Sequence, residues 1–184
     1  MDRRRAEGGA FLVAFAACIP AANWLIGHAG TVCLRDGPCL IPVAPGVLAP
    51  SGVTMAGIAL VLRDLVQRRL GVGVAVGAIL AGAALSALVA PPALVFASAA
   101  AFLLSELADF AVYTPLARRR LVLAVIASSL VGLVVDSIVF LWLAFGSLDF
   151  LAGQVVGKAW MVLLSIPFVM WLRRRDERTG MERA

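Results

Sequence analysis

Charged side chains are scarce in this sequence. Asp, Glu, Lys and Arg make up 15% of its 184 residues, whereas hydrophobic residues make up 62% and the mean hydropathy is +0.98. A soluble domain has about 25% charged residues, because its surface must face water. Here the few charges stand in short clusters between apolar runs of about twenty residues, each long enough to cross a bilayer as a helix. The sequence therefore excludes a soluble domain and predicts a polytopic membrane protein.

The sequence also has little of what a metal site or an enzyme would need. It contains one His and three Cys. His28 has no evident ligand partner and no two cysteines have the CxxC spacing of a zinc site, so no metal ion is predicted. No GxSxG motif stands beside a usable base, and the glycine run Gly71, Gly73, Gly77 lies in an apolar segment rather than after a strand, where a nucleotide-binding loop would be. We therefore predict no cofactor and no enzymatic activity.

Long apolar runs predict six transmembrane helices. Their approximate bounds are residues 9–29, 51–69, 71–89, 91–116, 121–145 and 149–172. Most of these runs are apolar nearly all round, without the alternation of a membrane β-barrel strand. Pro50 and Gly146 lie at predicted helix boundaries, where proline and glycine are common. We expect an all-α fold, with one transmembrane domain over residues 1–184.

Arginine is concentrated on one side of this predicted bundle. The clusters are Arg3 to Arg5, Arg63 with Arg68 and Arg69, Arg118 to Arg120, and Arg173 to Arg175 with Arg178. With six spans they all fall on the same side, and the opposite side has Arg35 as its one arginine. The positive-inside rule then places both termini in the cytoplasm of a multi-pass protein of the bacterial plasma membrane. Membrane orientation also explains the net charge of +5, so we predict no nucleic-acid partner.

Two features of the N-terminal part each have two interpretations. An arginine cluster, an apolar stretch and small residues ending at Cys18 also resemble a secretory signal with a lipoprotein-type cleavage site, and cleavage there would leave five spans. Cys33 and Cys39 lie in the predicted outer loop, where an oxidising exterior would permit a disulfide. Two unpaired cysteines fit that loop equally well. The sequence alone decides neither question.

Five charged side chains within the predicted spans are the strongest indication of function. They are Asp64, Glu106, Asp109, Asp136 and Lys158. Each would cost about 2.5–3.5 kcal/mol at the centre of a bilayer, so it must face the protein interior or a water-filled cavity. Apart from Asp64, the carboxylates share one central counter-ion, Lys158, which leaves about two of them to bind a proton, an ion or a polar ligand. The alternative is that these groups only join helices, and Asp64 beside Arg63 fits that interpretation best.

Helical spacing brings further polar groups onto the same faces. Ser129 and Asp136 are seven residues apart, and Gln154 and Lys158 are four apart. Trp160 offers a flat ring for stacking, and Asn23 adds a polar group from the first span. The predicted substrate-binding residues are therefore Asn23, Asp64, Glu106, Asp109, Ser129, Asp136, Gln154, Lys158 and Trp160. Their surplus negative charge disfavours an anionic substrate and favours a neutral or cationic planar compound.

Four ordered segments resemble a known family of membrane proteins. They are residues 60–66 (LVLRDLV), 105–113 (SELADFAVY), 128–137 (SSLVGLVVDS), and Lys158 followed by 163–167 (LLSIP). On these segments the sequence resembles the queuosine precursor transporters, once called the vitamin uptake transporter (VUT) family. That family has Gln where Glu106 stands, Gln near Gly132 and Asp near Ser165. These differences leave room for another purine-like or vitamin-like ligand.

The resemblance implies a six-helix inner-membrane protein, surrounded by lipid, that imports a small molecule. The substrate would be 7-cyano-7-deazaguanine or 7-aminomethyl-7-deazaguanine, the precursors of queuosine in tRNA. Carboxylates such as Asp136 would accept from the donor edge of the base, and Lys158 would orient its carbonyl group. Without an ATP-binding motif, the chain would act as a carrier or facilitator, as a homo-oligomer or with separate energising subunits. A membrane subunit of a vitamin uptake system and a structural protein with buried ion pairs are the alternatives.

Overall fold

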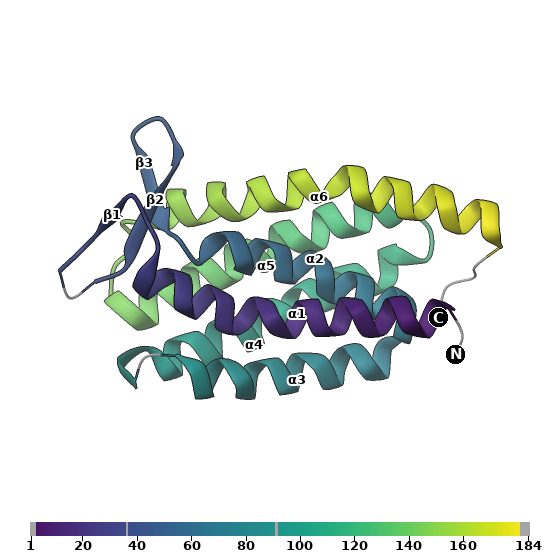
Figure 1. Cartoon of the computed structure of the whole chain (residues 1–184), viewed down its shortest axis with the longest axis horizontal. Coiled ribbons are helices and arrows are strands. Elements are labelled where there is room, and N and C mark those ends of the chain that lie inside the picture. The colour runs from purple at the N-terminus through teal and green to yellow at the C-terminus, as the bar shows by residue number, and fades with distance from the viewer. Residues whose placement is uncertain (1–2, 36, 91, 181–184) are drawn as a thin grey trace.

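The structure is a computed structural model that describes residues 3–35, 37–90 and 92–180. Within these ranges the chain forms six long α-helices, a 3-10 turn and a small sheet. The helices are α1 (Arg3–His28), α2 (Val53–Leu70), α3 (Val72–Val89), α4 (Val95–Ala117), α5 (Leu121–Phe145) and α6 (Leu151–Thr179), and the 3-10 turn is η1 (Pro92–Leu94). The helices run along one long axis (Figure 1). This arrangement agrees with the predicted all-α membrane class.

Five of the helices in the described part of the chain are long and apolar enough to cross a membrane, and they support a multi-pass membrane protein. They are α1, α3, α4, α5 and α6. The exception is α2, which contains Arg63, Asp64, Arg68 and Arg69 among its 18 residues. Helix α2 is also the best buried, since 12 of those 18 residues are buried. The sixth span therefore stays a prediction.

The predicted helix bounds agree best for α5, which begins at Leu121 and ends at Phe145 as expected. Helix α1 begins earlier than predicted, at Arg3, and α6 continues past residue 172 to Thr179. The extension of α6 is explained by Asp176, whose side chain is buried against α2 rather than exposed to water. Residue 91, where the fourth span was predicted to begin, lies outside the described residues.

The segment predicted as an outer loop forms a three-stranded antiparallel sheet. Its strands are β1 (Val32–Cys33), β2 (Cys39–Ala44) and β3 (Val47–Pro50), in the order β1-β2-β3. Cys33 pairs with Cys39 in the register of β1 and β2, and the two form a disulfide. Gly46 has a φ of 72°, which suits glycine in the tight turn between β2 and β3. The sheet lies at one end of the bundle (Figure 1).

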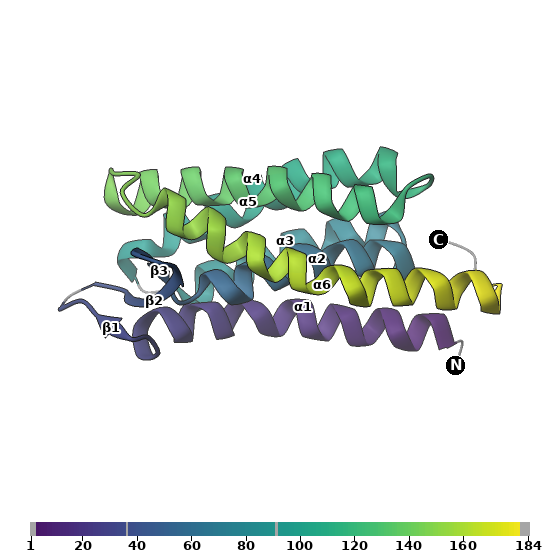
Figure 2. The ribbon, with the colours of Figure 1, turned by 90° about the horizontal axis from the view of Figure 1, so that it is seen from above.

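Helix α2 is the centre of the bundle. It contacts all five other helices, whereas α4 packs mainly on α5 and α3. Figure 2 shows α1 on one side of the molecule and the α4–α5 pair on the other, with α2 and α6 between them. The starts of α1 and α5 and the ends of α2, α4 and α6 lie at the end opposite the sheet (Figures 1 and 2). Most of the arginine is therefore at one end of the molecule, as the predicted orientation requires, and which side of the membrane that end faces stays a prediction.

Candidate functional site

Helices α2 and α6 approach each other closely at Lys158. Gly57 of α2 makes this possible, because a Cβ atom there would lie 2.8 Å from the Lys158 carbonyl oxygen. The buried Lys158 ammonium group then donates to Asp136 Oδ2 at 2.5 Å, Gln154 Oε1 at 2.6 Å and Ser137 Oγ at 2.8 Å. An ammonium group has three donors, so these bonds use its full capacity. The group ties α5 to α6 in the middle of the bundle.

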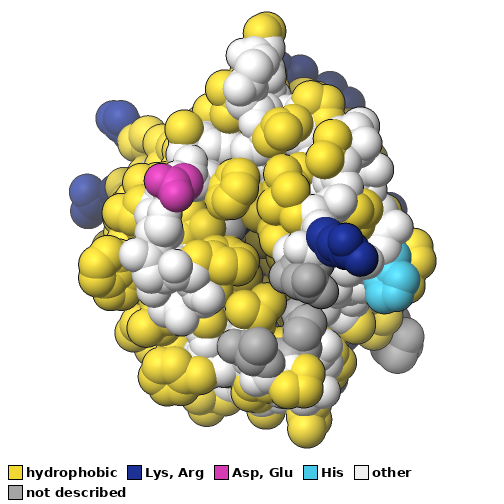
Figure 3. Space-filling model, turned by 90° about the vertical axis from the view of Figure 1, so that its left-hand side faces the viewer, with side chains coloured by type: hydrophobic (Ala, Val, Ile, Leu, Met, Phe, Trp, Pro, Cys, Tyr) yellow, Lys and Arg dark blue, Asp and Glu magenta, His cyan; other side chains and the backbone are white. Residues whose placement is uncertain are grey.

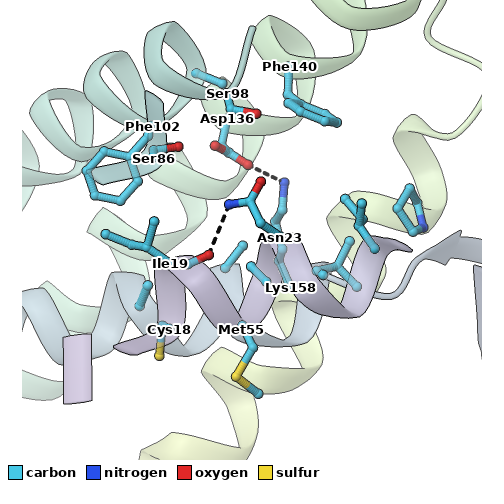
Figure 4. Close-up of a pocket in the computed structure, with 18 of the residues that line it drawn as sticks. Cys18, Ile19, Asn23, Met55, Ser86, Ser98, Phe102, Asp136, Phe140 and Lys158 are labelled. Carbon is cyan, nitrogen blue, oxygen red and sulfur yellow. Dashed lines mark hydrogen bonds and ion pairs between the residues drawn. The ribbon is translucent and has the colours of Figure 1, made fainter. Parts of the chain in front are cut away.

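Lys158, Asp136 and Gln154 line a cavity of about 110 Å³. All six helices line it with their halves nearer the sheet, and its polar residues are Asn23, Ser86, Ser98, Asp136, Gln154 and Lys158. The rest of the wall is apolar and includes Ile19, Phe102 and Phe140 (Figure 4). Since one water needs about 10–15 Å³ on this scale, the cavity has room for several waters or one small molecule. The sheet end of the protein is hollowed near its centre (Figure 3).

The cavity presents hydrogen-bond acceptors to a ligand. Asn23 Nδ2 donates to the Ile19 carbonyl oxygen at 3.0 Å, which leaves Asn23 Oδ1 without a partner among the described residues. Asp136 is only partly buried, with 21% of its side chain exposed. One of its oxygens binds Lys158, and within the described ranges no hydrogen bond reaches the other oxygen. Two free acceptors beside a buried cation suit a neutral ligand that has donor groups along one edge.

A second cavity of about 30 Å³ lies deeper in the bundle. It shares Asp136, Lys158 and Phe102 with the first cavity, and it adds Ser105 and Glu106 from α4. The two cavities therefore meet at the Lys158–Asp136 pair. The lining of this second cavity thus includes residues of the candidate binding site and one residue, Glu106, of a buried ion cluster.

The buried ion cluster is centred on Arg63 of α2, whose side chain is 0% exposed. Arg63 Nε donates to Glu106 Oε2 at 3.1 Å, Nη1 donates to Gln67 Oε1 at 3.1 Å, and Nη2 donates to Asp109 Oδ1. Arg63 Nη2 also lies 3.0 Å from Asp64 Oδ1. Three carboxylates from α2 and α4 thus share one guanidinium group. We call Arg63, Asp64, Glu106 and Asp109 the Arg63 cluster.

The position of Arg63 differs from the prediction, which grouped this residue with Arg68 and Arg69 at the membrane surface. Arg63 lies more than one helical turn before the end of α2, and it is fully buried. Its neighbours Arg68 and Arg69 are also buried, because both bind Asp176 of α6. The prediction was wrong because a run of arginines near a helix end looks the same whether it faces lipid headgroups or a carboxylate of another helix.

The structure brings together part of the predicted site. Asn23, Asp136, Gln154 and Lys158 line the larger cavity, and Glu106 lines the smaller one. Asp64 and Asp109 lie behind Glu106 in the Arg63 cluster. Ser129 is fully buried and lines neither cavity. Trp160 is 51% exposed, and its Nε1 donates to the Val43 carbonyl oxygen at 3.0 Å, so its ring holds the sheet against α6 instead of facing the cavity.

Sequence reasoning missed two kinds of residue at this site. Ser86 and Ser98 line the cavity, but serines are common in membrane helices, and neither has a distinctive neighbour in the sequence. Ser137 binds Lys158 and stands directly after Asp136. That adjacency was a usable signal, because consecutive helical residues near one end of a long lysine side chain can both reach it.

A second set of ion pairs lies at the end of the bundle opposite the cavity. Arg68 Nη2 donates to Asp176 Oδ2 at 2.6 Å, and Arg69 Nη2 donates to Asp176 Oδ1 at 2.8 Å. Arg175 Nη2 of α6 donates to Glu7 Oε2 of α1 at 2.5 Å, which adds α1 to this set of ion pairs. These contacts tie α1, α2 and α6 together where the helices end. The larger cavity is thus lined by the helix halves nearer the sheet, and these ion pairs lie at the opposite end of the bundle.

The residues present do not form a metal site of an ordinary kind. No group of three or more His, Cys, Asp or Glu side chains in the described part of the chain could hold a metal ion. The carboxylates that do lie close together, in the Arg63 cluster, have a guanidinium group among them.

Comparison with known proteins supports the resemblance found in the sequence. No curated protein and no solved structure matches this chain. A family model does match residues 86–172, which is just under half of the chain. The matched segment extends from the end of α3 into α6 and includes Glu106, Asp109, Asp136 and Lys158. Over that segment the chain is similar to the family described as "Putative vitamin uptake transporter".

Proposed function

We propose that this chain is an inner-membrane importer of a small, planar, base-like compound. The observation on which this rests is the cavity at which Asn23, Asp136, Gln154 and Lys158 meet among apolar and aromatic side chains. Ligand sites have this composition, with a few placed polar groups in a mostly apolar wall. The family match to uptake transporters supports transport rather than catalysis.

The substrate that fits this proposal best is a queuosine precursor, 7-cyano-7-deazaguanine or 7-aminomethyl-7-deazaguanine. Such a base has a ring NH and an exocyclic amine on one edge, and Asp136 Oδ1 and Asn23 Oδ1 are acceptors for them. Gln154 lies beside Lys158 and offers an amide for the base carbonyl. Phe102 or Phe140 would contact the face of the ring. A phosphorylated compound is disfavoured, because its charge would be buried in a mostly apolar wall where Lys158 is already paired with Asp136.

A second candidate is a membrane-embedded binding subunit of a vitamin uptake system. The largely apolar wall of the cavity and the description of the matched family favour it. In that case the chain would bind its ligand alone but would need an energising partner for uptake. Copurification with an ATPase from native membranes would distinguish this candidate from a self-sufficient importer.

The test is salvage of the precursor in cells that cannot synthesise it and that lack their own importer. Expression of this chain should restore the modified nucleoside in tRNA at a low external concentration of 7-cyano-7-deazaguanine. The Asp136→Asn variant should not restore it. The matched control is Asp149→Asn, which removes an exposed carboxylate outside the cavity lining and should restore tRNA modification like the unchanged chain.

Protein abundance in the membrane must be measured in parallel. If tRNA stays unmodified although the unchanged chain is present in the membrane, the queuosine precursor is not the substrate. If Asp136→Asn restores modification fully, the cavity is not the binding site.

A further inference from the structure

We propose that Glu106 is a proton-binding site that exchanges its proton with the cavity, so that substrate uptake is coupled to proton entry. The coupling rests on the proposed transport function, whereas the proton site does not. Glu106 is on α4 and is the member of the Arg63 cluster that shares the smaller cavity with the Lys158–Asp136 pair. The charges of the cluster and of this pair together determine what charge Glu106 can hold.

The first argument is the charge balance of the Arg63 cluster. Asp64, Glu106 and Asp109 are at most 2% exposed, and within the described residues Arg63 is the one cation that pairs with them. Three ionised carboxylates would leave two uncompensated negative charges in the bundle. Burying one such charge without a partner costs several kcal/mol, and such a group becomes neutral instead. The cluster must therefore hold protons or another cation.

The groups around Glu106 give no further compensation. Helix α2 contributes Arg63 and Asp64, α5 contributes Asp136, α6 contributes Lys158, and α4 itself contributes Asp109. Lys158 is matched by Asp136 at 2.5 Å, so that pair is already neutral. Helix α3 packs on α4 and has no ionisable side chain.

A second, independent observation is a carboxylate oxygen without a donor. Asp109 Oδ2 is buried, and no group in the described part of the chain forms a hydrogen bond with it. It lies against α5 at Gly132, where a Cβ atom would be 3.2 Å away from this oxygen. An ionised oxygen in that position is unfavourable, because desolvation is not offset by a hydrogen bond. The cluster therefore stabilises fewer ionised carboxylates than the three that it contains.

The third argument is access. Glu106 lines the 30 Å³ cavity, whereas Asp64 and Asp109 line neither of the two cavities. That cavity shares Asp136 and Lys158 with the larger one, so of the three carboxylates Glu106 is the one placed to exchange a proton with the larger cavity. Its lining combines the apolar Ala56, Ala59, Leu60 and Phe102 with Ser105, Glu106, Asp136 and Lys158. A metal cation would need several oxygen ligands and would lie beside the Lys158 ammonium group, whereas a proton needs only the Glu106 carboxylate.

The exchange is a single acid–base step. The Glu106 carboxylate takes a proton from a hydronium ion in the cavity: one O–H bond of the hydronium breaks, one O–H bond forms on Glu106, neutral water is left, and one negative charge is removed. In the reverse step the proton returns to water and the carboxylate is restored beside Arg63. A change of one charge alters the balance between Arg63, Glu106 and the Lys158–Asp136 pair, and this links proton binding to the substrate cavity.

Infrared spectroscopy of the full chain in lipid vesicles tests the proton site directly. At neutral pH we expect the C=O absorption of a protonated carboxyl group, with a shift in D₂O that shows exchange with water. The Glu106→Gln variant should weaken this absorption, because Asp64 and Asp109 still share the single cation Arg63, while the matched control Asp149→Asn should keep it in full. Absence of the band in the unchanged chain, or an equally strong band in Glu106→Gln, would overturn the proposal.

Uptake of 7-cyano-7-deazaguanine into the same vesicles tests the coupling. An inward proton gradient at constant external pH should accelerate uptake several-fold, a sodium gradient should have no effect, and Glu106→Gln should lose the response to the gradient. Stimulation by sodium instead would assign the cluster to that ion. If no uptake occurs although the infrared band is present, the substrate assignment is wrong and the proton site stands.

Discussion

The Lys158–Asp136 pair joins α5 to α6, and both of its residues line the cavity. Its charges lie 2.5 Å apart, and Lys158 has two further neutral partners, Gln154 and Ser137. Removing one member of a buried pair leaves the other charge uncompensated, which typically costs about 3–5 kcal/mol. Replacing both by neutral groups avoids most of this cost. Single and double variants can therefore separate the structural role of the pair from its role in binding.

The prediction for this pair compares Asp136→Asn, Lys158→Met and the double variant. Each single variant should lower uptake about tenfold or more, because a hydrogen bond to a charged group contributes about 1.5–3 kcal/mol. In the double variant, protein abundance and thermal stability should recover while uptake stays low. Uptake per molecule and melting temperature in detergent are the two measurements. Recovery of uptake in the double variant would mean that the pair is only structural.

At the scale of helices, two glycines allow close packing of α6: Gly57 of α2 at its contact with α2, and Gly153 of α6 at its contact with β3. Gly57 lets α2 lie against the backbone of Lys158, and Gly153 lets α6 lie against the Leu48 carbonyl oxygen of β3. Glycine is common where membrane helices approach closely, since lipid supplies no hydrophobic drive for their association. Gly77 of α3 differs from these two, because a Cβ atom added there would meet no described atom within 4 Å.

We therefore expect opposite results for two substitutions of the same kind. Gly57→Ala should destabilise the protein by about 1–3 kcal/mol, because the added methyl group would clash with α6 backbone that cannot move aside freely. Gly77→Ala adds the same group in open space and should be neutral or stabilising by up to about 1 kcal/mol. Thermal unfolding in detergent measures both. Equal stabilities of the two variants would show that the α2–α6 contact is looser than described.

At the scale of the whole molecule, the two ends of the bundle differ in charge and in structure. One end has the sheet (Figure 1), the disulfide and the cavity, and the other has most of the arginine and the Asp176 ion pairs. The positive-inside rule assigns the arginine-rich end to the cytoplasm. The cavity would then be on the outer side, as the first state of an importer requires.

The prediction for the whole molecule is its orientation. Reporter fusions after Arg69, Arg120 and Arg175 should give a cytoplasmic signal, and fusions near Gly37 and Ser147 an external one. An external signal at Arg120 would contradict six spans with both termini inside.

Thiol labelling from the outer face gives an independent check of the same orientation. Cys33 and Cys39 should react only after reduction of their disulfide. Cys18 is buried in α1 and should stay unlabelled under both conditions. Labelling of Cys33 without reductant would mean that the disulfide is absent in the cell.

The membrane class and most helix bounds could be predicted from the sequence, because both depend on local composition. An apolar run of sufficient length forms a helix in lipid whatever its neighbours are, since its backbone polar groups have no other partner there. The same reasoning identified Asp136 and Lys158, whose charge is anomalous within an apolar run. The sheet was missed, because its three strands are short, β2 contains Pro42, and the disulfide and pairing that hold it join separate strands.

Only the tertiary structure decided which polar groups meet. Arg63 and Arg68 look alike in the sequence, yet one binds carboxylates of α4 in the middle of the bundle and the other binds Asp176 at its end. Trp160 is two residues from Lys158, but on a helix this spacing turns its ring away from the cavity. The sequence by itself determined that the predicted spans contain charges, because a charge within an apolar run must turn away from lipid. That Arg63, Arg68, Arg69 and Asp176 are buried as well was decided by the tertiary structure. Their partners, and hence the surplus charge near Glu106, depend on helix packing, which brings together residues that are distant in the chain.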